Sequence, residues 1–241
     1  MSNHCGRRSF LAAIFLLAAG GARAINLDTP APLNLTSAQI VERMQSHNRA
    51  RLDGLKHYQS LRHYQVEYQG FSIKLAAKMD VEVNYDAKSG KNFRIVSQSG
   101  SKTLCEKVLK RAVDSEREAS QDKSATALTP ANYRFHLDGN ENLGGRPAYL
   151  MDVEPLVATK FLYRGKIWVD ASDFALVKIE AEPAKNPSFW IARTLIRQSF
   201  VKTGNFWLPE QNRSETKVRV GGTAVFTIDY GTYQVEPSSP H

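Results

Sequence analysis

The clearest pattern in the sequence is an alternation of apolar and polar side chains over residues 71–86. One face of this stretch is apolar and the other is polar or charged, which is typical of a half-buried β-strand. A strand of about 16 residues would run for about 50 Å, far beyond the usual length, so we expect a strongly curved sheet. The apolar face consists of Phe71, Ile73, Leu75, Met79, Val81, Val83 and Tyr85.

Most of the remaining chain carries further strand patterns. Tyr64, Val66 and Tyr68 alternate with polar residues and predict a strand just before the long one. Short turn-like connections, such as Gly144-Gly145 and Gly221-Gly222, join later runs and indicate an antiparallel meander. These other strands are predicted at 93–99, 133–138, 146–154, 160–170, 174–182, 189–202, 206–220 and 223–235.

Two segments show helical spacing instead. Thr36 is a suitable N-cap for the first, which places Ile40, Val41 and Met44 on one face and ends near Gly54. The second is expected to fray over residues 116–124. Its apolar stripe consists of Leu104, Cys105, Val108, Leu109, Ala112 and Val113.

About ten strands and two helices predict a mainly β, α+β fold. A sheet this wide with one apolar face must cover that face, so we expect a curved antiparallel sheet that forms an incomplete barrel. The two helices lid or fill part of its concave face. Two alternatives stay open for the remainder, which is either an apolar ligand pocket or a core filled by side chains.

The start of the chain predicts export. Residues 1–24 combine basic Arg7 and Arg8, an apolar run over 10–19 and a small-residue ending, which is the pattern of a signal peptide cleaved after Ala24. The apolar run is shorter than the roughly 20 residues of a spanning helix. We therefore expect a periplasmic protein, exported by the Sec or twin-arginine route, with residues 25–241 as a single domain.

Charge and motifs do not favour nucleic acid or catalysis. Removing the signal lowers the formal net charge from +8 to +5, and the basic residues are spread along the chain, so no nucleic-acid partner is expected. Phosphate loops, serine nucleophile elbows and zinc motifs do not occur. Cys105 falls on the apolar face of a helix, as an inert thiol would. No enzyme activity, metal or cofactor is expected.

Three stretches of the second half resemble a known family. They are Phe161 to Asp170, Glu180 to Trp190 and Phe206 to Pro209, and they are similar to outer-membrane lipoprotein-sorting proteins of the superfamily of LolA, LolB and RseB. The resemblance implies an incomplete antiparallel barrel whose helices lid a hydrophobic cavity for acyl chains. Residues 100–120 depart from the LolA pattern, because they are predicted to be mostly helical.

The resemblance implies a periplasmic carrier or chaperone for the acyl chains of lipoproteins or lipids. Its role would be outer-membrane lipoprotein sorting or envelope lipid trafficking, with a membrane-anchored donor or acceptor protein as a further partner. An envelope-stress sensor similar to RseB is the alternative. Trp190 also fits a packing or strand-rim position. The expected apolar lining is Tyr64, Val66, Tyr68, Ile73, Leu75, Met79, Val81, Ile167, Val169, Trp190, Ile196, Phe226 and Ile228.

Overall fold

The computed structural model describes residues 34–121, 123–186, 189–219 and 221–237. The expected signal peptide, residues 1–24, lies outside the described residues. The helical elements are α1 Ser37–Gly54, α2 Lys102–Leu104, the π-helical turn η1 Cys105–Leu109, α3 Lys110–Gln121 and α4 Lys123–Thr126. The strands are β1 Leu55–Gln69, β2 Lys74–Asp86, β3 Gly90–Gly100, β4 Tyr133–Leu143, β5 Arg146–Pro155, β6 Tyr163–Asp170, β7 Leu176–Pro183, β8 Ile191–Thr203, β9 Phe206–Val218, β10 Thr223–Tyr230 and β11 Gln234–Pro237.

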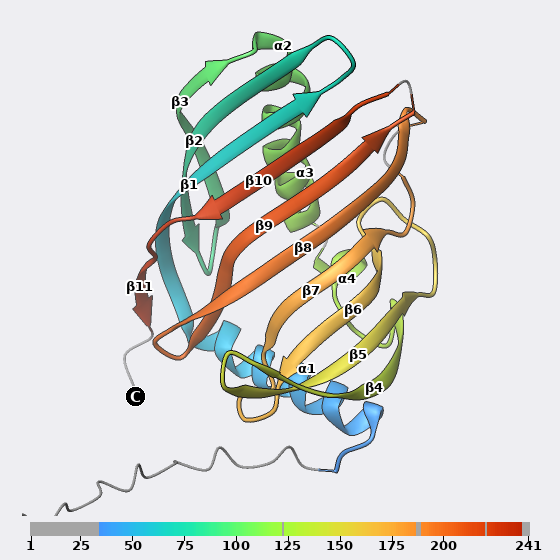
Figure 1. Cartoon of the computed structure of the whole chain (residues 1–241). Coiled ribbons are helices and arrows are strands. Elements are labelled where there is room, and N and C mark those ends of the chain that lie inside the picture. Colours follow the sequence, from blue (N-terminus) through green and yellow to red (C-terminus); the bar gives the residue numbers. More distant parts are fainter. Residues whose placement is uncertain (1–33, 122, 187–188, 220, 238–241) are drawn as a thin grey trace, which may run out of the picture.

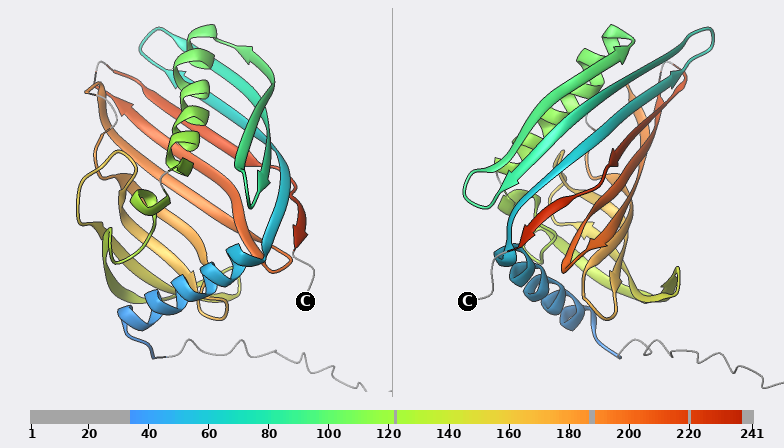
Figure 2. Two further views of the ribbon diagram at one scale, coloured as in Figure 1. Left: turned by 180° about the vertical axis from the view of Figure 1, so that it is seen from behind. Right: turned by 90° about the vertical axis from the view of Figure 1, so that its left-hand side faces the viewer.

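All strands belong to one antiparallel sheet, whose order is β3-β2-β1-β10-β9-β8-β7-β6-β5-β4, with β11 paired to β1 (Figure 1). Over the described residues the sheet does not close, because β3 and β4 lie at its two edges. The sheet curves, and the helices lie on its concave side (Figure 2). The prediction of a mainly β fold with an incomplete antiparallel barrel is confirmed.

Helices cover two separate parts of the concave face. The segment from α2 to α4 connects the edge strand β3 to the opposite edge strand β4, while α1 crosses one end of the strands (Figure 2). The predicted start of α1 is confirmed by a capping box. Thr36 Oγ1 accepts a bond from Gln39 N at 3.3 Å, and Gln39 Oε1 accepts one from Thr36 N at 2.9 Å.

The described residues form three hydrophobic clusters: a small one of Ala148, Leu150 and Trp168, and two large ones, named the first and the second cluster, to which the helices contribute. The first packs Leu109 and Val113 of the helical segment against β1, β2 and β10, and includes Tyr64 and Val81. The second packs Ile40, Val41 and Met44 of α1 against β5, β6 and β7. Apolar burial at about 25 cal/mol per Å² stabilises each cluster, and neither extends across the middle of the sheet.

Several predicted boundaries were wrong for identifiable reasons. The strand expected around Tyr64 to Tyr68 begins earlier, at Leu55. Ser60 and Arg62 occupy inward positions of this strand and are buried, so they hid the apolar alternation. The strands expected from 71, 160 and 189 begin at Lys74, Tyr163 and Ile191.

Two further differences concern the helix and the last strand. The second helix does not fray over 116–124, because Glu116 is held by ion pairs and α3 continues to Gln121. The strand expected over 223–235 is divided into β10 and β11. Gly231 lies between them and approaches β1 closely, since a Cβ there would be 2.4 Å from the Leu61 carbonyl oxygen.

Candidate functional site

The middle of the concave face is the part that the two clusters leave partly exposed. Strand pairing connects Val66 to Phe226, Phe226 to Ser214, Ser214 to Ile196 and Ile196 to Ala181. Side chains of directly paired residues lie on the same side of a sheet, so these five face the concave side together. Val66 and Ala181 are buried at the two ends of the row, whereas the three between them are half-buried.

The neighbouring rows extend this exposed region along β8 and β9. Gln198 pairs with Asn212 and is half-buried like it, and the hydroxyls of Thr194 and Thr216 lie 3.0 Å apart. We name this region the central strip, defined as Thr194, Ile196, Gln198, Asn212, Ser214, Thr216 and Phe226. Its polar members are hydroxyls and amides, and none of its residues is charged.

The structure distributes the predicted lining over the two large clusters, the region of the central strip and one end of the sheet. The first cluster holds Tyr64, Val66, Met79, Val81 and Ile228, and the second holds Ile167 and Val169. Tyr68, Ile196 and Phe226 are half-buried near or within the central strip. Ile73, Leu75 and Trp190 are exposed at one end of the sheet. Only Tyr68, Ile196 and Phe226 therefore lie where a ligand would meet them without displacing core side chains.

The sequence analysis missed the polar half of the strip. Asn212, Ser214 and Gln198 occur in stretches rich in polar residues on both faces, so alternation gives no signal there. Their positions become meaningful only through the register, which aligns Asn212 with Ile228 and Ser214 with Phe226. A pairing-based reading of β9 and β10 would have found them.

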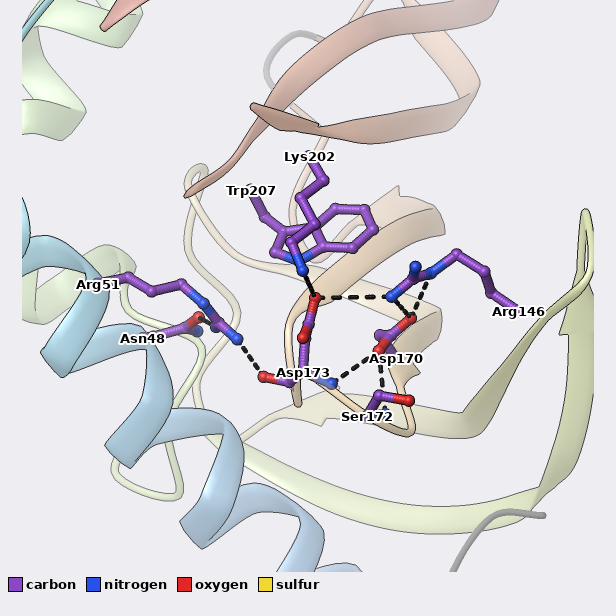
Figure 3. A network of polar contacts seen from close by, with 8 residues as sticks. All are labelled: Asn48, Arg51, Arg146, Asp170, Ser172, Asp173, Lys202 and Trp207. Carbon is purple, nitrogen blue, oxygen red and sulfur yellow. Dashed lines mark hydrogen bonds and ion pairs between the residues drawn. The ribbon is translucent and has the colours of Figure 1, made fainter. Parts of the chain in front are cut away.

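The turn between β6 and β7 fixes the end of the sheet that α1 crosses (Figure 3). Asp170 is buried, and its Oδ1 accepts backbone bonds from Ser172 at 3.0 Å and Asp173 at 2.7 Å. Its other oxygen, Oδ2, accepts a bond from Arg146 Nε at 2.8 Å. The carboxylate of Asp170 holds this turn closed.

Asp173 connects the same turn to two other elements (Figure 3). Its Oδ2 accepts bonds from Lys202 Nζ at 2.7 Å and from Trp207 Nε1 at 2.9 Å, both of the β8–β9 hairpin. Arg51 of α1 donates to the Asp173 carbonyl oxygen. Burial acts to raise the pKa of Asp173, but the hydrogen bonds from Lys202 and Trp207 help to lower it by more. The pKa of Asp173 therefore lies below its usual value. This network holds α1 against the base of the concave face.

An ion-pair group positions α3 over the other end of the sheet. Arg62 is buried on β1, and its Nη1 lies 2.7 Å from Glu116 Oε2 on α3. Lys91 Nζ lies 2.8 Å from the other carboxylate oxygen of Glu116. Burial acts to lower the pKa of Arg62, but Glu116 together with Tyr230, Tyr64 and Tyr58 raises it by more in sum. Burial acts to raise the pKa of Glu116, and Lys91 and Arg62 lower it more, so both groups stay charged.

A pocket of about 350 Å³ lies on the convex side, near the network of Figure 3. Arg146, Lys178 and Arg197 surround it, and each forms an ion pair with a carboxylate: Asp170, Glu180 and Glu215, respectively. Its cations are therefore neutralised by the protein itself. The apolar part of its wall consists of Leu143, Ala148, Val177, Phe200 and Trp207.

In the part of the chain that the structure describes, no group of three or more His, Cys, Asp and Glu side chains is placed to hold a metal ion. Cys105 is buried in the first cluster, as expected. None of the described helices has the length and apolar character needed to cross a membrane.

No protein-family model matches the sequence, and no curated protein is a significant match to it. Among solved structures, a DUF1329 family protein from Desulfovibrio piger aligns with 88% of this chain and 96% of its own, at 14% identity and a TM-score of 0.42. A Vibrio parahaemolyticus domain, provisionally assigned as an outer membrane lipoprotein-sorting protein, aligns with 85% and 95%, at 10% identity and a TM-score of 0.41.

The LolA superfamily protein NE2245 from Nitrosomonas europaea aligns with 86% of this chain and 96% of its own, at 12% identity and a TM-score of 0.37.

Proposed function

We propose that the protein binds an acyl chain of a lipid or lipoprotein along the central strip and carries or shields it in the cell envelope. The observation that supports this most is the paired row from Val66 to Ala181, which is buried at both ends and half-buried in the middle. Apolar atoms of Phe226 and Ile196 stay in contact with water there. An acyl chain laid on the strip removes them from water, and each buried methylene contributes about 0.8 kcal/mol.

The composition of the strip fits this class of ligand. Its hydroxyls and amides, such as those of Ser214 and Asn212, can donate hydrogen bonds to ester or amide carbonyls next to an acyl chain. No residue of the strip is charged, so binding an apolar chain does not require desolvating an ion. A neutral polar lining with two apolar residues therefore suits a chain with a carbonyl headgroup better than a charged metabolite.

The placement in the envelope rests on the sequence. Residues 1–24 have the pattern of a signal peptide, and residues 161–209 resemble lipoprotein-sorting proteins. A periplasmic carrier or chaperone for lipoprotein or lipid acyl chains follows from combining this with the central strip. A membrane-anchored donor or acceptor would complete the transfer. The regulatory alternative, a stress sensor, differs in predicting a retained peptide partner and no lipid uptake.

Titration with a fluorescent fatty acid tests the proposal, using two variants of the same strand. Ser214→Trp fills the central strip, whereas Arg213→Trp places the same side chain on the convex face as a control. Displacing about two methylenes costs about 1.6 kcal/mol, so we expect Ser214→Trp to weaken binding by at least about tenfold. Arg213→Trp should bind as the unmodified protein does.

Asn212→Phe gives a second inner-face variant in case Ser214→Trp fails to fold. Two results would overturn the proposal: no uptake of fatty acid by the unmodified protein, or equal affinity of inner-face and convex-face variants. Recovery of a membrane-bound regulator by the lipid-free protein would favour the sensor alternative.

A further inference from the structure

Three loops meet at the end of the sheet opposite α1 (Figure 1). Large apolar side chains of these loops are exposed. The loops connect β1 to β2, β7 to β8, and β9 to β10. The Phe71 side chain is 98% exposed and that of Phe189 is 77% exposed. Ile73 and Trp190 follow at 56% and 58%. Exposed apolar residues gathered at one place indicate an interaction surface rather than chance exposure.

Contacts between the loops show that these side chains form one surface. Phe71 lies over the β9–β10 turn, since a Cβ on Gly221 would be 2.7 Å from its ring. Arg219 of the same turn places its guanidinium 5.3 Å from the Phe189 ring centroid. Its backbone N donates to the Trp190 carbonyl oxygen at 2.8 Å, which joins the turn to the β7–β8 loop. We name this surface the rim, defined by Phe71, Ile73, Phe189 and Trp190.

The charged residues within the three segments that form the rim are all positive. Lys74, Lys185, Lys217 and Arg219 are exposed beside the four apolar residues. The sequences 70–74, 184–192 and 216–223 contain no Asp or Glu. The nearby Glu182 is engaged by Arg193 in an ion pair. Aromatic side chains flanked by cations, without carboxylates, are what a surface of anionic lipid headgroups attracts.

We propose that the rim docks the protein on an anionic lipid membrane surface, with the four apolar side chains entering the headgroup region and the four cations facing lipid phosphates. A protein partner would be expected to present carboxylates in a fixed arrangement, whereas the cations here come from separate segments: the start of β2, the β7–β8 connection and the end of β9 with the turn after it. Headgroups of a fluid lipid surface can move to pair with cations in such an arrangement. This inference does not depend on what occupies the central strip.

The position of the rim adds a functional consequence. Strands β8, β9 and β10 end or begin at the rim, and Thr194 and Thr216 of the central strip lie just inside it. The opposite ends of these strands lie towards α1 (Figure 2). A membrane docked on the rim would therefore stand at the end of the strip that α1 does not cross.

Sedimentation with vesicles tests the docking surface. We expect the full chain to bind vesicles of phosphatidylethanolamine with phosphatidylglycerol, to bind phosphatidylcholine vesicles much less, and to dissociate as salt is raised. Phe71→Ser with Phe189→Ser should lower partitioning by about tenfold or more. Lys74→Gln or Lys217→Gln should lower it about fivefold each. Leu52→Ser, at a site on α1 that is 61% exposed, is the control and should have no effect.

Tryptophan quenching by brominated acyl chains gives a second measurement. Trp190 is exposed at the rim, Trp168 is buried, and Trp207 is half-buried and bonded to Asp173 at the α1 end. Quenching should therefore occur on docking and disappear in Trp190→Phe, which still sediments with vesicles. The proposal is overturned if the unmodified protein binds neither kind of vesicle, or if the rim variants bind as tightly as it does. Fatty-acid uptake that survives in the rim variants would separate this surface from the central strip.

Discussion

Arg62 of β1 and Glu116 of α3 form a buried ion pair at 2.7 Å that joins the sheet to the helix covering it. The Arg62 guanidinium also stacks over the Tyr230 ring, with 4.6 Å from Cζ to the ring centroid. Neither residue was predicted from the sequence to be paired, because they are far apart along the chain. The pair decides where α3 lies, and therefore how much of the concave face stays uncovered.

Removing the carboxylate of this pair should be costly. In Glu116→Gln the Arg62 charge stays buried without its counter-charge, and losing one partner of a buried pair costs about 3–5 kcal/mol. Urea unfolding would measure the difference in free energy of unfolding. Glu118→Gln on the same helix is the matched control, since its exposed pair with Lys160 should contribute less than about 1 kcal/mol. Equal losses in both variants would contradict the assignment.

The same pair should make stability depend on pH in one direction. The folded pKa of Glu116 is lowered, so its contribution is fully present above the unfolded value of about 4.3 and is lost as the pH falls through the folded pKa. The stability difference between the unmodified protein and Glu116→Gln should therefore be constant near neutral pH and shrink in acid. A difference that grows on acidification would have the wrong sign for this mechanism.

The base of the concave face should depend on Asp170. Asp170→Ala removes the acceptor for two backbone N–H groups and for Arg146, and leaving such donors unpaired costs about 1–3 kcal/mol. Thermal unfolding would measure it, and amide exchange should become faster in α1, which Arg51 ties to this turn. Asp138→Ala is the control, because its exposed pair with Lys166 adds little.

Gly165 should be intolerant of a side chain. Its φ is 146°, and a Cβ there would be 2.4 Å from the Glu180 carbonyl oxygen on the neighbouring strand. Gly139 has a similar φ of 152°, but a Cβ there would meet nothing within 4 Å. Gly165→Ala should thus destabilise the protein by about 1 kcal/mol or more beyond Gly139→Ala, measured in urea. Comparable losses would mean that backbone strain alone limits both positions.

The fold could be predicted from the sequence where one face of an element is consistently apolar. The run 71–86 and the helical stripe around Leu109 satisfy this condition, and the Thr36 cap marked the start of the first helix. The incomplete barrel was predicted from these elements together. The start of β1 could not be predicted, because buried Ser60 and Arg62 find their partners in distant segments. Local patterning carries no information on such long-range pairing.

The site was predictable to a smaller extent. The apolar residues expected in a lining were mostly real inward positions, yet Tyr64, Met79 and Ile167 proved to be packed in the two clusters. What separates a lining residue from a core residue is whether a helix covers it, and that depends on where α1 and α3 are anchored. Asp173 and Glu116, which anchor them, gave no signal in the hydrophobic pattern.

The central claim is that an acyl chain lies on the central strip. A fatty acid with a diazirine group near its methyl end, bound, irradiated and analysed by mass spectrometry of cross-linked peptides, locates the chain directly. The account predicts labels on the inner face of β8, β9 and β10, at Ile196, Ser214 or Phe226. Labels confined to the convex-side pocket, at Leu143 or Val177, would contradict it.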